Sequence, residues 1–330
     1  MADVAAVAGV GLKTVSRVVN QETGVSAATL ARVESAIASL DYRRNEIARS
    51  LLPGQASGSI GLVIGNISNP CNAMIARAVE QVAESHGQLL ITVSSEDDSA
   101  REEKVVRVLT SRRIDGLIVV PAGRDGDQSH LEAERRLGTP IVCIYRPPRK
   151  LECDTILIDN VGGVRMAVEH LIAHGHRRIG MVADGLTFSS LPERLLGYRL
   201  ALDSAGIGFD EELVQLSGQE PRDAAAATDA LLSITRPPTA ILAANNRMTV
   251  GVLRTLRARG LERVAVVGFD DVELGELMAT PLTVVAYDTE QIGVLAASCL
   301  FDRLAGDDSP PKHHVLPTHL VPRGSGEIRP

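Results

Sequence analysis

The chain has 330 residues, of which 45% are hydrophobic and 23% are charged. Its length predicts two or three domains, and its hydrophobic share excludes general disorder. No stretch is long and apolar enough for a membrane span, and the first ten residues lack the features of a secretory signal. The scattered cysteines (Cys71, Cys143, Cys153, Cys299) fit a reducing cytoplasm and argue against a disulfide framework or a metal cluster.

The net charge of −7 argues against a nucleic-acid partner, but the charge is unevenly distributed. Residues 1–58 hold six basic and five acidic residues, whereas the rest of the chain is acidic. Because this difference is small, only the placement of the charges can indicate whether residues 1–58 bind nucleic acid. Aromatic residues make up only 2% of the chain, so a binding site is expected to depend on polar groups.

The first 52 residues show a helical pattern and no strand pattern. A first helix follows Asp3, a suitable N-cap, and Gly9-Val10-Gly11 ends it. A second helix is predicted from Lys13 to about Asn20, and a third from about Ala27 to Leu40. Short helices joined by a three-residue turn are typical of a helix-turn-helix, although a small helical bundle that contacts no nucleic acid would show the same pattern.

The second helix has an apolar and a polar face, which favours DNA binding over the plain bundle. Its valines, Val15, Val18 and Val19, can pack inward. The opposite face carries hydrogen-bond donors at helical spacing: Lys13, Ser16, Arg17 and Asn20. Lys and Arg can pair with guanine in the major groove, and the hydroxyls of Thr14 and Ser16 suit phosphate oxygens.

Residues 45–52 predict one more short helix, which Pro53-Gly54 stops. Because eight residues cannot hold a helix alone in water, this segment is expected to order on a partner. Residues 53–59 predict a linker.

From residue 60 the pattern changes to alternating strands and helices, which predicts an α/β fold with doubly wound parallel sheets. The predicted strands are 60–65, 89–93, 116–120, 141–145, 179–182, 213–216, 240–243 and 264–269. The predicted helices are 72–86, 101–111, 132–137, 162–174, 195–205, 223–233, 248–259 and about 291–305. Because these are too many strands for one compact sheet, we expect two lobes with a ligand cleft at the carboxyl ends of their strands.

Residues 9–20, GVGLKTVSRVVN, resemble the helix-turn-helix signature of the LacI family of bacterial transcriptional regulators. Further motifs of this resemblance lie along the whole chain: Asp3-Val4-Ala5, Ile67-Ser68-Asn69-Pro70, Asp159-Asn160, GHRRIG at 175–180, Arg194 with Gly197-Tyr198, VGFDD at 267–271 and Pro281-Leu282-Thr283. The chain departs from the family pattern at Gly11, where Ser is common, and at Arg44, where Pro is common.

The resemblance implies a DNA-binding headpiece (1–52, with a hinge helix at about 45–52) and a core (60–330) similar to periplasmic sugar-binding proteins. Such proteins bind near-palindromic operators as homodimers, with Leu12, Lys13 and Arg17 in the base-reading positions. It also implies that Ala48 and Leu51 contact DNA. Leu51 corresponds to an apolar wedge in the minor groove, although this residue could serve only as a contact between hinge helices.

The resemblance further implies an effector site in the cleft. Arg194 and Asp270 match ligand-binding positions, Asn245 is a third candidate, and each of them could instead be a cap or a lobe-bridging group. In the first lobe the candidates are Asn69, Cys71 and Asn72, where relatives often carry aromatic residues, together with Arg146. The first lobe is expected at about 60–158 and 288–318, and the second at about 159–287 and 319–330. Asn246 stands where Asp is usual, and Tyr287 where Gln or a similar residue is common.

We therefore expect a cytoplasmic, homodimeric repressor that is controlled by a sugar and needs no cofactor. A purine-responsive corepressor-type regulator is the alternative. An enzyme is disfavoured because the chain has no GxxxxGK[ST], GxGxxG or GxSxG motif and no metal-ligand spacing among its histidines. A periplasmic binding protein would need an export signal and no headpiece. His313-His314 is expected in a solvated tail, and residues 320–325, LVPRGS, spell a thrombin site that also resembles the family's natural ending.

Overall fold

The computed structural model describes residues 1–19, 22–42, 57–123, 128–185 and 190–330. The chain forms two compact units, Met1–Ser57 and Gly58–Pro330. Each unit has its own hydrophobic core, so we describe them separately.

The first unit contains the helices α1 (Ala2–Ala8), α2 (Leu12–Val19) and α3 (Ala27–Ser39). Gly9 ends α1 in the left-handed conformation, with φ of 61°, and the Ser26 hydroxyl caps α3 by accepting a hydrogen bond from the Thr29 amide. Val4, Val15 and Val33 are fully buried among these helices. The expected N-cap is wrong, because α1 begins at Ala2 and Asp3 lies in its first turn, where its charge favours the helix dipole.

The second unit is built on two six-stranded sheets. The first sheet has the order β11-β5-β4-β3-β1-β2, and all its pairs are parallel. Its strands are β1 (Ser59–Ile64), β2 (Leu89–Ser94), β3 (Leu117–Val119), β4 (Ile141–Ile144), β5 (Asp154–Ile158) and β11 (His313–Leu316). Ser59 pairs with Leu89 and already belongs to β1, so the predicted linker ends before residue 59.

The second sheet has the order β12-β10-β9-β8-β6-β7, and β12 is the antiparallel member. Its strands are β6 (Ile179–Asp184), β7 (Val214–Ser217), β8 (Ala240–Ala243), β9 (Ala265–Phe269), β10 (Thr283–Ala286) and β12 (His319–Val321). The prediction of doubly wound parallel sheets is therefore confirmed, with one antiparallel edge strand added.

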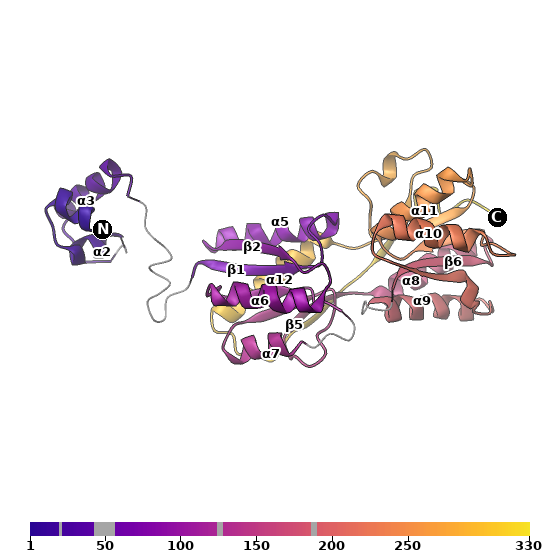
Figure 1. Ribbon diagram of the computed structural model, residues 1–330, viewed down its shortest axis with the longest axis horizontal. Coiled ribbons are helices and arrows are strands. Elements are labelled where there is room, and N and C mark those ends of the chain that lie inside the picture. The colour runs from indigo at the N-terminus through magenta and orange to yellow at the C-terminus, as the bar shows by residue number, and fades with distance from the viewer. Residues whose placement is uncertain (20–21, 43–56, 124–127, 186–189) are drawn as a thin grey trace. The chain divides into compact units, whose positions relative to one another are not determined.

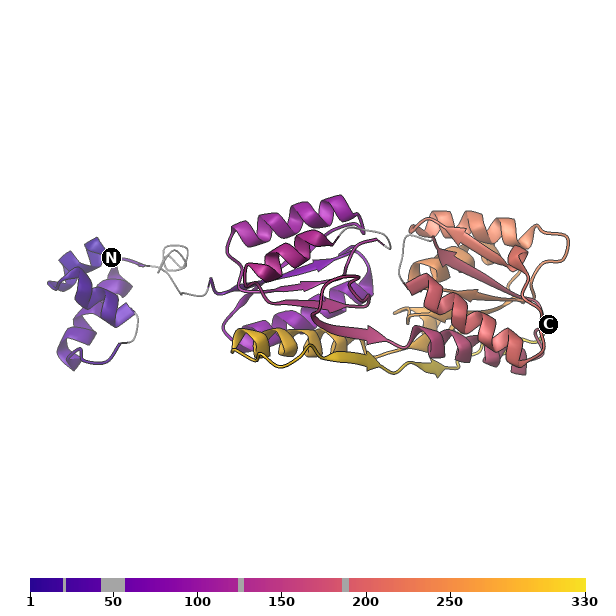
Figure 2. The ribbon, with the colours of Figure 1, turned by 90° about the horizontal axis from the view of Figure 1, so that it is seen from below.

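Helices cover both faces of each sheet, as Figures 1 and 2 show. On the first sheet, α5 (Pro70–Ser85) and α12 (Thr289–Leu304) cover one face, and α6 (Ser99–Ser111) and α7 (Ser129–Arg136) cover the other. On the second sheet, α8 (Asn160–Ala173) and α9 (Ser190–Ser204) lie opposite α10 (Pro221–Leu232) and α11 (Asn246–Ala258). Two 3-10 turns, Glu211–Leu213 and Gly275–Leu277, complete the described elements. None of the described helices is long and apolar enough to cross a bilayer.

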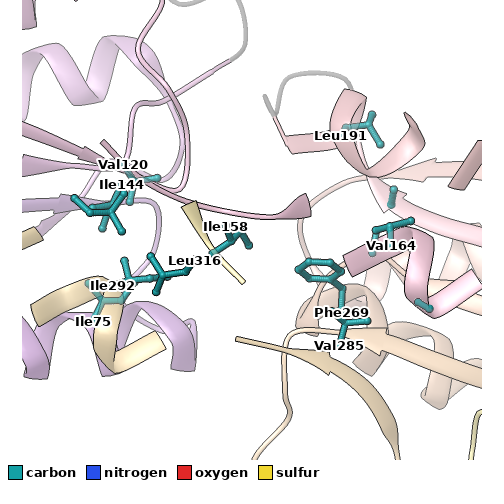
Figure 3. Close-up of a cluster of buried hydrophobic side chains, with 14 of the residues drawn as sticks. Ile75, Val120, Ile144, Ile158, Val164, Leu191, Phe269, Val285, Ile292 and Leu316 are labelled. Carbon is teal, nitrogen blue, oxygen red and sulfur yellow. The ribbon is translucent and has the colours of Figure 1, made fainter. Parts of the chain in front are cut away.

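Apolar side chains also lie where the chain passes between the two lobes. The chain passes between β5 and α8, between β10 and α12, and between β11 and β12. In Figure 3, Ile158 and Leu316 lie between the group around Ile144 in the first lobe and Phe269 in the second. The part of the lobe junction where the chain crosses is therefore apolar.

Four of these strands were not predicted from the sequence: β5, β10, β11 and β12. The expectation of a tail at His313-His314 is wrong, because both residues belong to β11 and the His313 ring is 2.8 Å from the Thr155 hydroxyl. His313 is nevertheless exposed to solvent, as predicted. The end of the chain is also part of the second lobe. Ser325 is buried, and the Arg323 guanidinium pairs with Asp271 at 2.6 Å.

Candidate DNA-reading helix and ligand cavity

Helix α2 buries its valines and exposes the start of its polar face. Val15 and Val18 are buried and Val19 is half-buried against the core of the first unit, which confirms their predicted inward orientation. Leu12 is 55% exposed, and Lys13 is exposed. Thr14 and Ser16 are half-buried. Asn20, Ala48 and Leu51 lie outside the described residues.

Arg17 is held against the segment that follows α2. Its Nη2 donates to the Thr23 carbonyl oxygen at 3.1 Å, and its Nε is 3.5 Å from Glu22 Oε2. Both side chains of the ion pair remain close to half exposed, at 43% and 49%. Because exposed pairs of this kind contribute little, the guanidinium can exchange Glu22 for another acceptor at small cost.

A polar cavity of about 120 Å³ lies where the carboxyl ends of the two sheets face each other. Each of the strands β1 to β10 has a cavity-lining residue at its carboxyl end or within the next three residues. Examples are Asp97 after β2, Asp184 in β6 and Tyr287 after β10. The cavity brings together all seven residues predicted for the effector site: Asn69, Cys71, Asn72, Arg146, Arg194, Asn245 and Asp270.

Arg194 is a buried cation that α9 carries to the cavity wall. Its Nε donates to Asn160 Oδ1 at 2.9 Å, and its Nη1 donates to the Ala244 carbonyl oxygen. The guanidinium lies over the Phe269 ring, 4.1 Å from the ring centroid. These contacts hold the planar group in one orientation and leave further N–H donors for a ligand.

Asp270 and Asn246 meet at the ends of β9 and β8. The backbone N–H of Asn246 donates to Asp270 Oδ2 at 3.2 Å, whereas Asp270 Oδ1 has no hydrogen-bond partner among the described residues. Asp270 also has a positive φ of 68°, a conformation that Asp tolerates better than most residues. Asn245 caps α11, because its Oδ1 accepts from the Met248 amide at 2.9 Å.

Arg146 is paired inside the cavity. Its Nη1 lies 2.7 Å from Asp97 Oδ1, and both side chains are largely buried. Gly65 makes room for this pair, because a Cβ there would lie 2.6 Å from Asp97 Oδ2. Asp97 and Tyr145 both have positive φ, of 55° and 64°. Such backbone strain is often found at ligand sites.

The lobes touch each other at several points around the cavity. Asn246 Nδ2 donates to Asn69 Oδ1 at 2.8 Å, and Arg247 Nη2 donates to the Ser68 hydroxyl at 2.9 Å. The hydroxyls of Tyr145 and Tyr287 are 3.1 Å apart. Each contact joins a residue of the first lobe to one of the second, so a ligand here would touch both lobes.

The cavity keeps its phenol and thiol groups protonated. Burial raises the pKa of the hydroxyls of Tyr145 and Tyr287 well above the ordinary value. Burial, with the nearby charge of Asp270, raises the pKa of the Cys71 thiol, which therefore stays neutral. Burial also raises the pKa of Asp184, against the opposing effect of Arg194. No group of three or more metal-ligating side chains occurs in the described ranges.

The sequence analysis missed several lining residues, notably Asp97, Tyr145, Asn160, Asp184 and Arg247. It named Asn246 and Tyr287 only as departures from a family pattern. The rule that ligands lie at the carboxyl ends of parallel strands would have found Asp97, Tyr145 and Asp184, had it been applied to each strand in turn. The two tyrosines also place aromatic groups in a cavity that was expected to depend on polar groups.

Together the two units define a class of protein, a helix-turn-helix regulator with a core built to enclose a small molecule. Residues 1–45 match the family described as bacterial regulatory proteins, lacI family, and residues 168–326 match the periplasmic binding protein-like domain. The HTH-type transcriptional regulator CelR of Thermobifida fusca is 36% identical over 98% of this chain and 97% of that protein. The ribose operon repressor of Escherichia coli K12 is 32% identical over 98% of this chain and 99% of that protein.

Solved structures agree with these relatives. A complex of the transcriptional regulator CelR with cellobiose has a TM-score of 0.75 at 34% identity, and a Lac repressor dimer bound to operator and the anti-inducer ONPF has a TM-score of 0.86 at 28% identity. Each comparison covers 98% of both chains. This chain belongs to the LacI family of HTH-type transcriptional regulators, and it is a regulator of transcription rather than an enzyme.

Proposed function

We propose that the protein is a cytoplasmic homodimeric repressor whose operator affinity is controlled by a sugar in the interlobe cavity. The observation that carries the proposal is this cavity, whose walls come from both lobes and include a buried carboxylate oxygen without a partner. Carboxylate oxygens accept hydrogen bonds from hydroxyl groups, which sugars supply in number. The named ligands of similar proteins, cellobiose and ONPF, support the same class.

The proposed effector acts by favouring one arrangement of the lobes. A ligand shifts a conformational equilibrium only as far as it binds one state better than the other. A sugar that contacts Asp270 in the second lobe and Asn69, Cys71, Asn72 or Arg146 in the first meets this condition. Each first lobe begins at Gly58, so its arrangement in a dimer would set the spacing of the two linkers and hence operator affinity.

The proposed DNA contacts lie on α2 and the segment after α3. Leu12, Lys13 and Arg17 read bases, and Thr14 and Ser16 contact the backbone. Asn20 adds a hydrogen-bond donor on the same face, Ala48 contacts DNA, and Leu51 acts as a wedge in the minor groove. In a dimer, two such helices would fit the half-sites of a near-palindromic operator. The corresponding domain division is a headpiece at 1–52, a linker that ends before residue 59, and the two-lobed core.

An apolar hollow on the second lobe supports the dimer. It is lined by Leu253, Val272, Leu274 and Met278, among others, and has a volume of about 540 Å³. Leu274 is 65% exposed and Leu277, close by in the chain, is 75% exposed. Exposed leucines beside such a hollow favour burial against a second copy of the chain.

The test combines operator selection with effector titration. DNA is selected from a random-sequence pool with the purified protein, and its affinity is then measured by fluorescence anisotropy with and without sugars and purines. We expect a near-palindromic sequence whose affinity falls on addition of a sugar. The variant Arg194→Ala should keep operator binding and lose the effector response, whereas Arg222→Ala, whose side chain is 85% exposed, should behave like the parent protein. A response only to purines, or an Arg194→Ala variant that still responds, contradicts the proposal.

A further inference from the structure

Two buried cysteines of the first lobe lie side by side. The Sγ atoms of Cys143, in β4, and Cys153, just before β5, are 3.5 Å apart. Both residues belong to the apolar cluster that packs under α6 and α7, and both are free thiols. A disulfide bond holds its sulfurs about 2.05 Å apart, so the two atoms have to approach each other by only about 1.5 Å to form one.

Cys153 is the member of this pair that a small oxidant can reach. It lines a hollow of about 320 Å³ in the first lobe, whereas Cys143 is fully buried. The other walls of the hollow come from residues 138–141, which follow α7, and from Arg303 and residues 307–309 at the end of α12. A hydrogen peroxide molecule is much smaller than this hollow, so it can approach Cys153 while the lobe stays folded.

The surroundings of the pair keep Cys143 in its thiol form. The hydrogen bond with Cys153, together with burial, raises the pKa of the Cys143 thiol well above the ordinary value. Cys143 therefore keeps its proton and can donate its S–H to the neighbouring sulfur. Such a donor stabilises a thiolate at Cys153, and the thiolate is the form of cysteine that attacks a peroxide.

We propose that Cys143 and Cys153 form a redox-sensitive dithiol that hydrogen peroxide converts to a disulfide. The Cys153 thiolate attacks one peroxide oxygen and the O–O bond breaks, which leaves a sulfenic acid and a hydroxide that takes up the proton released by Cys153. The Cys143 sulfur then attacks the Cys153 sulfur, the S–O bond breaks, and the hydroxyl leaves as water with the Cys143 proton. The two sulfurs together lose two electrons, and the peroxide is reduced to two waters. This inference goes beyond the proposed function and does not depend on it.

The disulfide would close the loop that carries two residues of the cavity wall. Residues 145–152 connect β4 to β5, and Tyr145 and Arg146 at the start of this loop line the cavity. Further along the same loop, Arg149 and Lys150 are exposed. A cross-link removes conformational freedom from the segment that it closes. Oxidation at the hollow would therefore restrain the cavity wall at the end of β4.

The first test maps the disulfide in the full-length protein. The protein is treated with hydrogen peroxide and denatured, its remaining thiols are blocked with N-ethylmaleimide, and its tryptic peptides are analysed by mass spectrometry. Because trypsin cuts after Arg149 and Lys150, the disulfide would join peptide 137–149 to peptide 151–165. We expect this linked pair as the main oxidised product, and dithiothreitol should separate it. If both cysteines are recovered as maleimide adducts, or are linked to other cysteines, the inference is overturned.

The second test measures the loop in the folded protein. Trypsin cleavage at Arg149 and Lys150 is followed on reducing gels before and after peroxide treatment. We expect oxidation to slow this cleavage by about threefold or more in the parent, because the closed loop opens less often. Cys299→Ala, which removes a buried thiol of the same lobe, is the matched control and should respond like the parent, whereas Cys143→Ala should not respond. Circular dichroism confirms that the variants fold, and equal slowing in Cys143→Ala overturns the inference.

Discussion

Replacing Arg17 with Ala is expected to reduce sequence-specific DNA binding while leaving the fold unchanged. A guanidinium that pairs with one guanine contributes about 1–3 kcal/mol of discrimination, which doubles when a dimer uses two recognition helices. The loss should therefore be about 2–6 kcal/mol for the operator complex. Stability should change little, because the Arg17 side chain is 43% exposed and its polar contacts are an exposed ion pair with Glu22 and a hydrogen bond to the Thr23 carbonyl oxygen.

The expected loss of operator-binding free energy depends on the contacts that Arg17 must break before it can bind DNA. Its ion pair with Glu22 spans 3.5 Å and both partners are close to half exposed, so breaking it costs at most about 1 kcal/mol. This cost is smaller than the gain from a base contact, and Glu22→Gln should therefore preserve operator preference. The matched pair of variants separates loss of the guanidinium from loss of its partner.

The assay is fluorescence anisotropy with the selected operator and with a scrambled duplex, each over a range of salt concentrations. Loss of a base contact lowers the ratio of specific to nonspecific affinity, whereas loss of a phosphate contact weakens both duplexes alike and lowers the salt dependence. If Arg17→Ala weakens both duplexes to the same extent, Arg17 contacts the backbone and the base-reading assignment is wrong.

Three further predictions concern the stability of the fold. Arg303→Met should lower the free energy of unfolding, measured by urea denaturation, by about 3–5 kcal/mol, because it leaves the carboxylate of Asp154, whose side chain is only 2% exposed, without its partner. Adding Asp154→Leu should recover most of this loss. His176 is buried against the Ile328 carbonyl, and burial lowers the pKa of its ring below 6.5. As the pH falls, His176 therefore takes up a proton in the unfolded chain before it does so in the folded protein. The stability that neutral His176 contributes is consequently lost as the pH falls below 6.5. A His176→Gln variant whose stability depends on pH as steeply as the parent's would refute this. Val15→Ala should cost about 1–3 kcal/mol of headpiece stability, and Leu12→Ala, at an exposed site, close to nothing; equal effects would contradict the assigned faces of α2.

The strands missed by the sequence analysis show what local pattern cannot reveal. β11 and β12 are three to four residues long and carry histidines, and each is held by a distant partner, β5 in one sheet and β10 in the other. β5 begins at Asp154, whose charge interrupts an apolar run but is paired with Arg303 from α12. Uninterrupted apolar strands such as β8 and β9 were predicted, although β8 is no longer than β11, because burial on both faces leaves a continuous hydrophobic signal.

The candidate site was predictable to the extent that it follows strand ends and motifs. Arg194 and Asp270 were identified by motif, and Arg146 by its position after a strand. Asp97 and Tyr145 follow β2 and β4 and were therefore within reach of the strand-end rule, whereas their positive φ is a property of the backbone that no side-chain pattern shows. The role of Asn246 depends on the cap that Asn69 provides to α5, a contact between lobes that no linear motif encodes.

Because residues 323–325 are hydrogen-bonded into the second lobe, cleavage of the Arg323–Gly324 bond would report local unfolding of that lobe. The Arg323 amide donates to the Thr283 hydroxyl at 3.0 Å, and the Ser325 amide donates to the Pro281 carbonyl at 3.0 Å. A protease needs this segment detached and extended, so thrombin should cut only molecules whose second lobe has opened at that edge. Cleavage kinetics would then measure local unfolding directly, and a bound effector that stabilises the lobe should slow them.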